Sequence, residues 1–82
     1  MAEIHICIKC EGDGFPTEGE LALRNQLEDE IMQANLGTIV DSGGGRGVMD
    51  VFVEAQDVAA ARSAIETLVE RLGLADRTEL SV

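Results

Sequence analysis

The stretch TIVDSGGGRGVMDVFVEA, residues 38–55, decides the fold. Residues 38–42 predict one short strand and residues 48–55 a second, because both are rich in β-branched and other apolar side chains. In the second strand, the apolar side chains at positions 49, 51, 53 and 55 alternate with a more polar set, as expected when one face is buried. Residues 43–47 (GGGRG) form a flexible connection, so the whole stretch predicts a β-hairpin.

An amphipathic helix is predicted on each side of this hairpin. Before it, Thr17 and Glu20 form a capping box at the start of a helix that extends to about residue 35, with Gly37 as its cap. After it, Asp57 caps a second helix that Gly73 ends. Apolar residues recur at spacings of three and four in both helices: Leu23, Leu27, Ile31 and Ala34 in the first, and Val58, Ala61, Ile65, Leu68 and Leu72 in the second.

The two ends of the chain add two further strands. Residues 3–9 alternate strictly between polar and apolar, and residues 77–82 alternate in the same way. The element order is therefore β-α-β-β-α-β, which predicts an α+β, ferredoxin-like fold spanning residues 1–82 as one domain. In this fold a four-stranded antiparallel sheet carries two helices on one face, with the first and third strands in the centre.

Composition excludes several classes of function. The 82 residues include 16 Asp and Glu against 6 Lys and Arg, which gives a net charge of −10. Direct binding to nucleic acid is not expected, because such binding is dominated by basic contacts to phosphate. No apolar run is long enough to span a membrane, and the N-terminus lacks the pattern of a signal peptide. We therefore expect a cytoplasmic protein with reduced thiols, without membrane or direct nucleic-acid contacts.

The open face of the predicted sheet is the first candidate site. Phe52 is one of only two aromatic residues, and the strand pattern places it between Asp50 and Glu54. One interpretation is that Phe52 covers backbone or a neighbouring loop; the other is that it anchors a partner protein. The predicted contact surface comprises Asp50, Phe52 and Glu54 together with Glu28, Asp29 and Asp41. Arg46 lies in the glycine-rich segment and belongs to the same predicted surface. One interpretation of this segment is a loop whose backbone amides bind an anion with the help of Arg46; the simpler one is a mobile hairpin tip that contacts the partner.

The segment from His5 to Cys10 is the second candidate site. Cys7 and Cys10 form a C-x-x-C motif that, with the β-α-β-β-α-β order, resembles heavy-metal-associated domains, and the resemblance implies a soft-metal chaperone. The Met-Thr that precedes the first cysteine in that family is replaced here by His5-Ile6. Strand alternation also puts the two cysteines on opposite faces unless the chain twists after Lys9. The metal ligands would be His5, Cys7 and Cys10, and the alternative is two structural thiols without metal.

An enzyme is not expected, because the chain has one histidine, no tyrosine and no nucleophile elbow. The favoured function is a small acidic interaction module, of the inhibitor or immunity-protein kind, that presents carboxylates to a basic protein or nucleoprotein complex without a cofactor. A second hypothesis is an amino-acid-binding module similar to ACT domains, with Gly12 and Gly14 after the first strand. A homodimer that forms through the open sheet fits either hypothesis. The alternative to both is that the negative net charge serves only to keep the protein soluble.

One further resemblance supports the fold. The pattern E-x-x-L-x-x-x-L-E from Glu20, the glycine-rich hairpin and the segment MDVFVE resemble small bacterial and phage proteins of ferredoxin-like type. The resemblance spans residues 20–70 and implies the fold and a bacterial or phage origin. It implies no particular chemistry.

Overall fold

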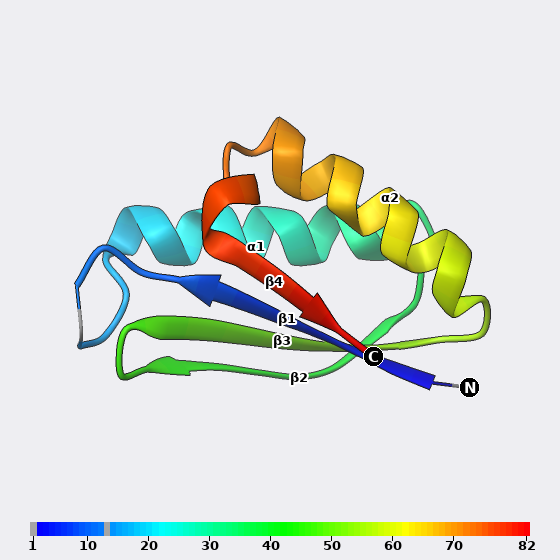
Figure 1. The fold of residues 1–82 in the computed structure, drawn as a ribbon, viewed down its shortest axis with the longest axis horizontal. Helices are drawn as coiled ribbons and strands as arrows, with labels where there is room; N and C mark the ends of the chain where they lie inside the picture. Colours follow the sequence, from blue (N-terminus) through cyan, green and yellow to red (C-terminus); the bar gives the residue numbers. More distant parts are fainter. Residues whose placement is uncertain (1, 13) are drawn as a thin grey trace.

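A computed structural model describes residues 2–12 and 14–82 and shows the expected α+β, ferredoxin-like topology (Figure 1). The strands form one antiparallel sheet in the order β2-β3-β1-β4, so β1 and β3 are central as predicted. Both helices cover the same face of this sheet and leave the other face open (Figure 1). The elements, in chain order, are β1 (Ala2–Lys9), α1 (Glu18–Gln33), β2 (Thr38–Gly45), β3 (Val48–Ala55), α2 (Val58–Arg71), a 3₁₀ helix η1 (Ala75–Arg77) and β4 (Thr78–Ser81).

The core lies between the sheet and the two helices. Alternate residues of the central strands point into it, while their neighbours point to the open face. The fully or nearly fully buried apolar residues are Ile4, Ile6 and Ile8 in β1, Met49, Val51, Val53 and Ala55 in β3, Leu27 and Ile31 in α1, Ala61, Ile65 and Val69 in α2, and Leu74 before η1. The period-2 pattern therefore identified the buried faces of β1 and β3 correctly. The helical pattern identified Leu27 and Ile31 in α1 correctly, whereas Ala34, which it also assigned to the apolar face, is exposed. Within residues 2–12 and 14–82, no helix is both long and apolar enough to cross a membrane.

The glycine-rich segment is not the flexible loop that its composition suggested. Residues 43–45 belong to β2 and pair in register with residues 48–50 of β3. The connection is a tight turn at Arg46 and Gly47, whose φ angles of 56° and 81° lie in the left-handed region. This region is required at both central residues of the turn that best matches the twist of a hairpin. Because Arg46 and Gly47 suffice for the turn, β2 continues through Gly43, Gly44 and Gly45.

The connection between β1 and α1 covers these glycines. A Cβ atom added at Gly44 would lie 3.1 Å from Cγ of Pro16, and one added at Gly45 would lie 3.7 Å from Cε1 of Phe15. Pro16 and Phe15 thus pack against strand backbone that carries no side chain. Phe15 remains 85% exposed, so this contact buries little of its surface.

The two helices end in different ways. Gly73 ends α2 with a φ of 75°, as predicted, and the amide of Leu74 donates to the carbonyl of Val69. The prediction for α1 was wrong, because Asn35 and not Gly37 takes the left-handed conformation, with a φ of 59°. Asparagine tolerates this conformation because its short polar side chain bonds locally.

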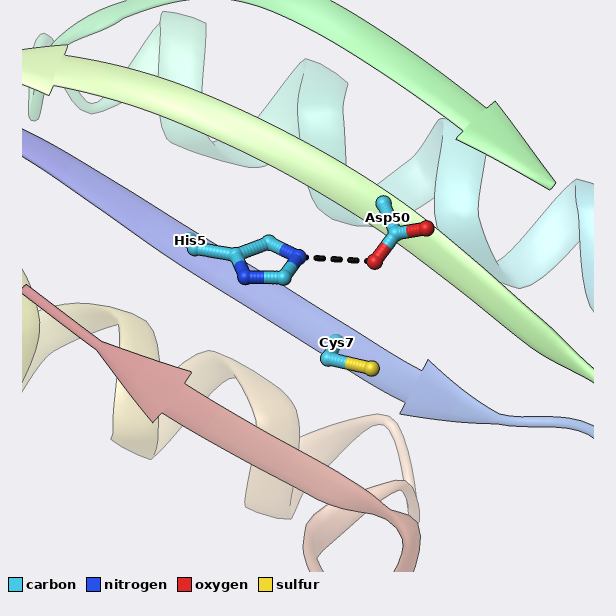
Figure 2. Close-up of side chains that lie close together, drawn as sticks. All are labelled: His5, Cys7 and Asp50. Atoms are coloured by element: carbon cyan, nitrogen blue, oxygen red, sulfur yellow. Dashed lines mark hydrogen bonds and ion pairs between the residues drawn. The ribbon is translucent and has the colours of Figure 1, made fainter.

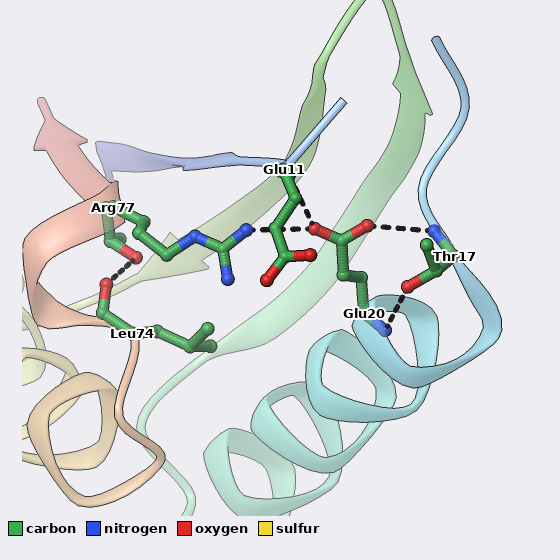
Figure 3. A network of polar contacts seen from close by, with 6 residues as sticks. Glu11, Thr17, Glu20, Leu74 and Arg77 are labelled. Carbon is green, nitrogen blue, oxygen red and sulfur yellow. Dashed lines mark hydrogen bonds and ion pairs between the residues drawn. The ribbon is translucent and has the colours of Figure 1, made fainter. Parts of the chain in front are cut away.

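The predicted capping box of α1 is present and forms part of a larger network (Figure 3). The backbone amide of Glu20 donates to the Thr17 hydroxyl, and the Glu20 carboxylate accepts from the amides of Thr17 and Glu11, both at 2.9 Å. The same carboxylate accepts from Nη2 of Arg77 at 3.0 Å. The hydrogen bonds from backbone amides, that of Thr17 first, hold the pKa of Glu20 below its ordinary value. One carboxylate therefore joins the loop after β1, the start of α1 and η1.

Candidate functional site

The open face of the sheet contains the residues that the strand pattern assigned to it. In β1 and β3, His5 lies opposite Phe52, Cys7 opposite Asp50 and Lys9 opposite Val48. On the other side of β1, Cys7 also lies opposite Glu79 of β4. Side chains directly opposite one another on neighbouring strands are close enough to interact. Asp50, Cys7 and Glu79 thus form one row across three strands.

Phe52 occupies the centre of this face. Its ring stacks on the His5 imidazole, with the ring centroids 4.5 Å apart and the planes inclined by 5°. Phe52 is half-buried, because the imidazole covers part of it while the rest faces solvent. This contact with a side chain of the neighbouring strand is neither the backbone nor the loop contact that the sequence suggested, and the role of Phe52 as an anchor for a partner stays a prediction. The stack also limits the positions that either ring can adopt.

Carboxylates surround this aromatic pair. Asp41 of the edge strand β2 lies opposite Phe52, at a bulge that leaves Val40 as the extra residue. Glu54 pairs with Glu3 across β1 and β3. We define the acidic face as Phe52 with the carboxylates around it, namely Glu3, Asp41, Asp50, Glu54 and Glu79. Lys9 is the basic residue that β1 adds to the open face, so the potential there is predominantly negative.

A second feature of the open face is a cluster of three different polar groups, His5, Cys7 and Asp50 (Figure 2). Nε2 of His5 lies 2.7 Å from Oδ1 of Asp50, a hydrogen bond between neighbouring strands. One ligand atom from each of the three residues lies within 4.8 Å of the others, and all three side chains are half-buried. An imidazole, a thiol and a carboxylate are all known metal ligands.

The two cysteines lie in different environments, as the alternation of β1 suggested. Cys7 belongs to the cluster on the open face, whereas Cys10 follows the strand and packs at the edge of the core. The structure therefore brings His5 together with Cys7 and adds Asp50, but within residues 2–12 and 14–82 it forms no metal-ligand cluster that contains Cys10. The C-x-x-C motif does not include Asp50, which lies on another strand. The signal that could have found it was the antiparallel register of β1 and β3.

Neither thiol is chemically activated. Burial raises the pKa of Cys7 above the ordinary value of 9.0, and the neighbouring Asp50 carboxylate raises it further. Burial also raises the pKa of Cys10, and Glu20 adds to this effect. Both thiols are therefore protonated at neutral pH, whereas nucleophilic cysteines require a lowered pKa.

The remaining predicted contact residues lie elsewhere. Glu28 and Asp29 belong to α1, which covers the opposite side of the sheet, so they do not join the acidic face. Arg46 lies exposed in the hairpin turn and lines a shallow hollow with Phe15, Gly44 and Asp50. It is therefore the basic side chain that borders the acidic face at the tip of the hairpin.

Comparison of this chain with protein-family models, with curated proteins and with solved structures finds no match.

Proposed function

We propose that this protein is an interaction module whose acidic face binds a basic protein. The observation that supports the proposal is the arrangement of Asp41, Asp50 and Glu54 around the half-buried ring of Phe52. Aromatic anchors within a polar rim are typical of protein interfaces. Carboxylates around such an anchor select a partner with arginine or lysine side chains and speed its association.

A heterologous partner fits this surface better than a second copy of the chain. Two acidic faces placed against each other would bring like charges together at neutral pH, which costs binding free energy. The open face lies on rigid central strands, so its side chains are held in place before the partner arrives. Such preorganisation reduces the entropy lost on binding.

The chemistry of the acidic face suits an inhibitor or immunity-type role. In such proteins carboxylates occupy the basic groove in which a nuclease or similar enzyme binds nucleic-acid phosphates. The net charge of −10 supports this role, because the module would be attracted to the same positive groove. The two free cysteines fit a reducing compartment such as the cytoplasm.

The test uses two variants with the same net charge. Asp41→Lys with Glu54→Lys reverses two charges beside Phe52 and leaves the His5–Asp50 pair intact. Glu66→Lys with Glu70→Lys reverses two exposed charges on α2, on the other side of the molecule. Tagged proteins are used to capture partners from nuclease-treated host extract at low salt. The captured basic protein is then purified and its affinity for each variant is measured.

We expect the sheet-face variant to bind at least tenfold more weakly than the wild type, since a charge pair at 4 Å contributes about 1 kcal/mol even in water. The α2 variant should bind within a factor of about two of the wild type, because only the overall field changes. Equal losses in both variants would show a non-specific charge effect and refute the assignment. Failure of the wild-type protein to retain any basic protein would refute the proposed function itself.

A further inference from the structure

The open face also contains a metal-ligand cluster, which shares Asp50 with the acidic face. We propose that His5, Cys7 and Asp50 form a binding site for a single zinc ion, with Glu79 or a water molecule as the fourth ligand. This site differs from the C-x-x-C site that the sequence suggested, because Asp50 replaces Cys10 in the ligand set. It does not rest on the proposed interaction with a basic protein.

The separations between the three groups are close to those that zinc requires. Tetrahedral zinc has bonds of about 2.0–2.3 Å to nitrogen, oxygen and sulfur, so its ligand atoms lie about 3.3–3.6 Å apart. In the structure Nε2 of His5 and Oδ1 of Asp50 are 2.7 Å apart, and all three ligand atoms lie within 4.8 Å of one another. Side-chain rotations that move these atoms by about an ångström would bring them to the required distances.

The surroundings of the cluster favour a tightly held metal. His5 and Cys7 are two residues apart on β1, so they point to the same face, and Asp50 lies opposite Cys7 on β3. The Phe52 ring stacks on His5 and restricts the orientation of the imidazole. The three ligands therefore need little ordering when a metal binds, which favours affinity.

Glu79 lies beside the cluster but does not belong to it, so its carboxylate becomes the fourth ligand only if the side chain moves toward the other three groups. It lies opposite Cys7 on β4, on the side away from Asp50, so the row across the sheet places a carboxylate on each side of the thiol. Cys7 and Glu79 also line a hollow of about 340 Å³, which leaves room for water beside the cluster. With water as the fourth ligand, the Cys7 thiolate and the Asp50 carboxylate balance the two positive charges of zinc; with Glu79 bound instead, the site carries one net negative charge. In both cases the thiol proton is released to solvent on binding.

The ligand set selects among metals. Calcium and magnesium prefer sites built entirely from oxygen ligands, whereas this cluster supplies a nitrogen and a sulfur beside its carboxylate. A mixed set of imidazole, thiolate and carboxylate suits zinc, and cobalt(II) occupies such sites with the same geometry. Cobalt(II) bound to a thiolate gives a charge-transfer band in the near ultraviolet, so it reports directly whether Cys7 is a ligand.

The experiment titrates the reduced, metal-free protein with zinc in a calorimeter and with cobalt(II) in a spectrophotometer. We expect one metal ion per chain and a thiolate–cobalt band. Cys7→Ser should remove the band, and Asp50→Asn should weaken zinc binding by more than the roughly 10–100-fold that loss of an outer-shell partner costs. Circular dichroism confirms that each variant is folded.

Two control variants make the outcome decisive. Cys10→Ser should retain the cobalt band and bind zinc as the wild type does, because Cys10 packs at the edge of the core. The Asp41→Lys, Glu54→Lys variant should also retain one zinc site, which separates this proposal from the interaction with a basic protein. Loss of binding in Cys10→Ser, or a wild-type protein that gives no thiolate–cobalt band, would overturn the proposal.

Discussion

Replacement of Gly37 by alanine is expected to lower the stability of the fold, because the surrounding atoms leave no room for a Cβ atom. Gly37 lies between α1 and β2, where the chain approaches β3 closely. In Gly37→Ala the new Cβ would lie 2.7 Å from the backbone oxygen of Glu54 and 2.7 Å from Cγ1 of Val53. Both contacts would have to lengthen to at least 3.4 Å, the lower limit of ordinary van der Waals contact. The backbone oxygen belongs to a central strand, so it cannot move without disturbing the sheet.

The size of the effect follows from two opposing contributions. Overpacking of a well-packed region costs about 1–3 kcal/mol. Replacing glycine by alanine also stiffens the unfolded chain, which recovers about 0.4–1 kcal/mol. The middle of the two ranges gives a net loss in the free energy of unfolding of about 1–2 kcal/mol. For a chain of this size that corresponds to a decrease in Tm of about 5–15 °C.

Gly19→Ala provides the matched control, since it has the same effect on the unfolded chain. Gly19 lies in the first turn of α1, and its nearest contact would be the Thr17 hydroxyl at 4.0 Å. This variant should gain up to about 1 kcal/mol, because alanine favours the helix over glycine. Thermal and urea unfolding followed by circular dichroism measure both variants. A Tm for Gly37→Ala equal to or above that of the wild type would refute the reasoning.

Three further variants test the stability of the fold. Glu20→Gln should lower Tm at pH 7, because the amide replaces a carboxylate that accepts from two backbone amides and Arg77. Folding lowers the pKa of Glu20, so the carboxylate contributes fully to the free energy of unfolding above the ordinary value of 4.5, and this contribution is lost as the pH falls below it. The difference in Tm between the variant and the wild type should therefore shrink on acidification. A constant difference down to pH 2 would contradict the assigned cause. Ile6→Ala should cost about 2–5 kcal/mol because Ile6 is fully buried. Phe52→Ala should cost less, about 1–2 kcal/mol including its stack on His5, and equal losses in urea unfolding would show that Phe52 is a core residue.

The sequence predicted those parts of the fold that depend on local patterns. Alternation in β1 and β3 identified the buried and open faces, and the Thr17–Glu20 pair identified the start of α1. The errors arose where tertiary contacts override composition. Residues 43–45 form strand because β3 and the loop at Pro16 cover them, and Gly37 is required for close approach rather than for a helix cap.

The candidate site was predicted in part, for a similar reason. The strand pattern placed Phe52, Asp50 and Cys7 on one face, but it could not say which residues of different strands lie opposite each other. The turn at Arg46 sets only the register of β2 and β3. β1 and β3 are separated in the chain by α1 and β2, so no turn length indicates that Cys7 lies opposite Asp50. Glu28 lies on another surface, since charge alone does not indicate which side of the molecule a helix residue faces.

The two proposals share Asp50, and this has a measurable consequence. Zinc brings two positive charges and displaces one thiol proton, so its binding makes the acidic face more positive by one charge. Across roughly 8 Å such a change is worth about 0.5–2 kcal/mol, which corresponds to a loss of about 2- to 30-fold in affinity for a basic partner. Linkage requires the partner to weaken zinc binding by the same factor. In Cys7→Ser, zinc should leave the affinity for the partner unchanged. If zinc has no effect on that affinity in the wild-type protein, the metal and the partner do not meet at Asp50, and one of the two sites must lie elsewhere.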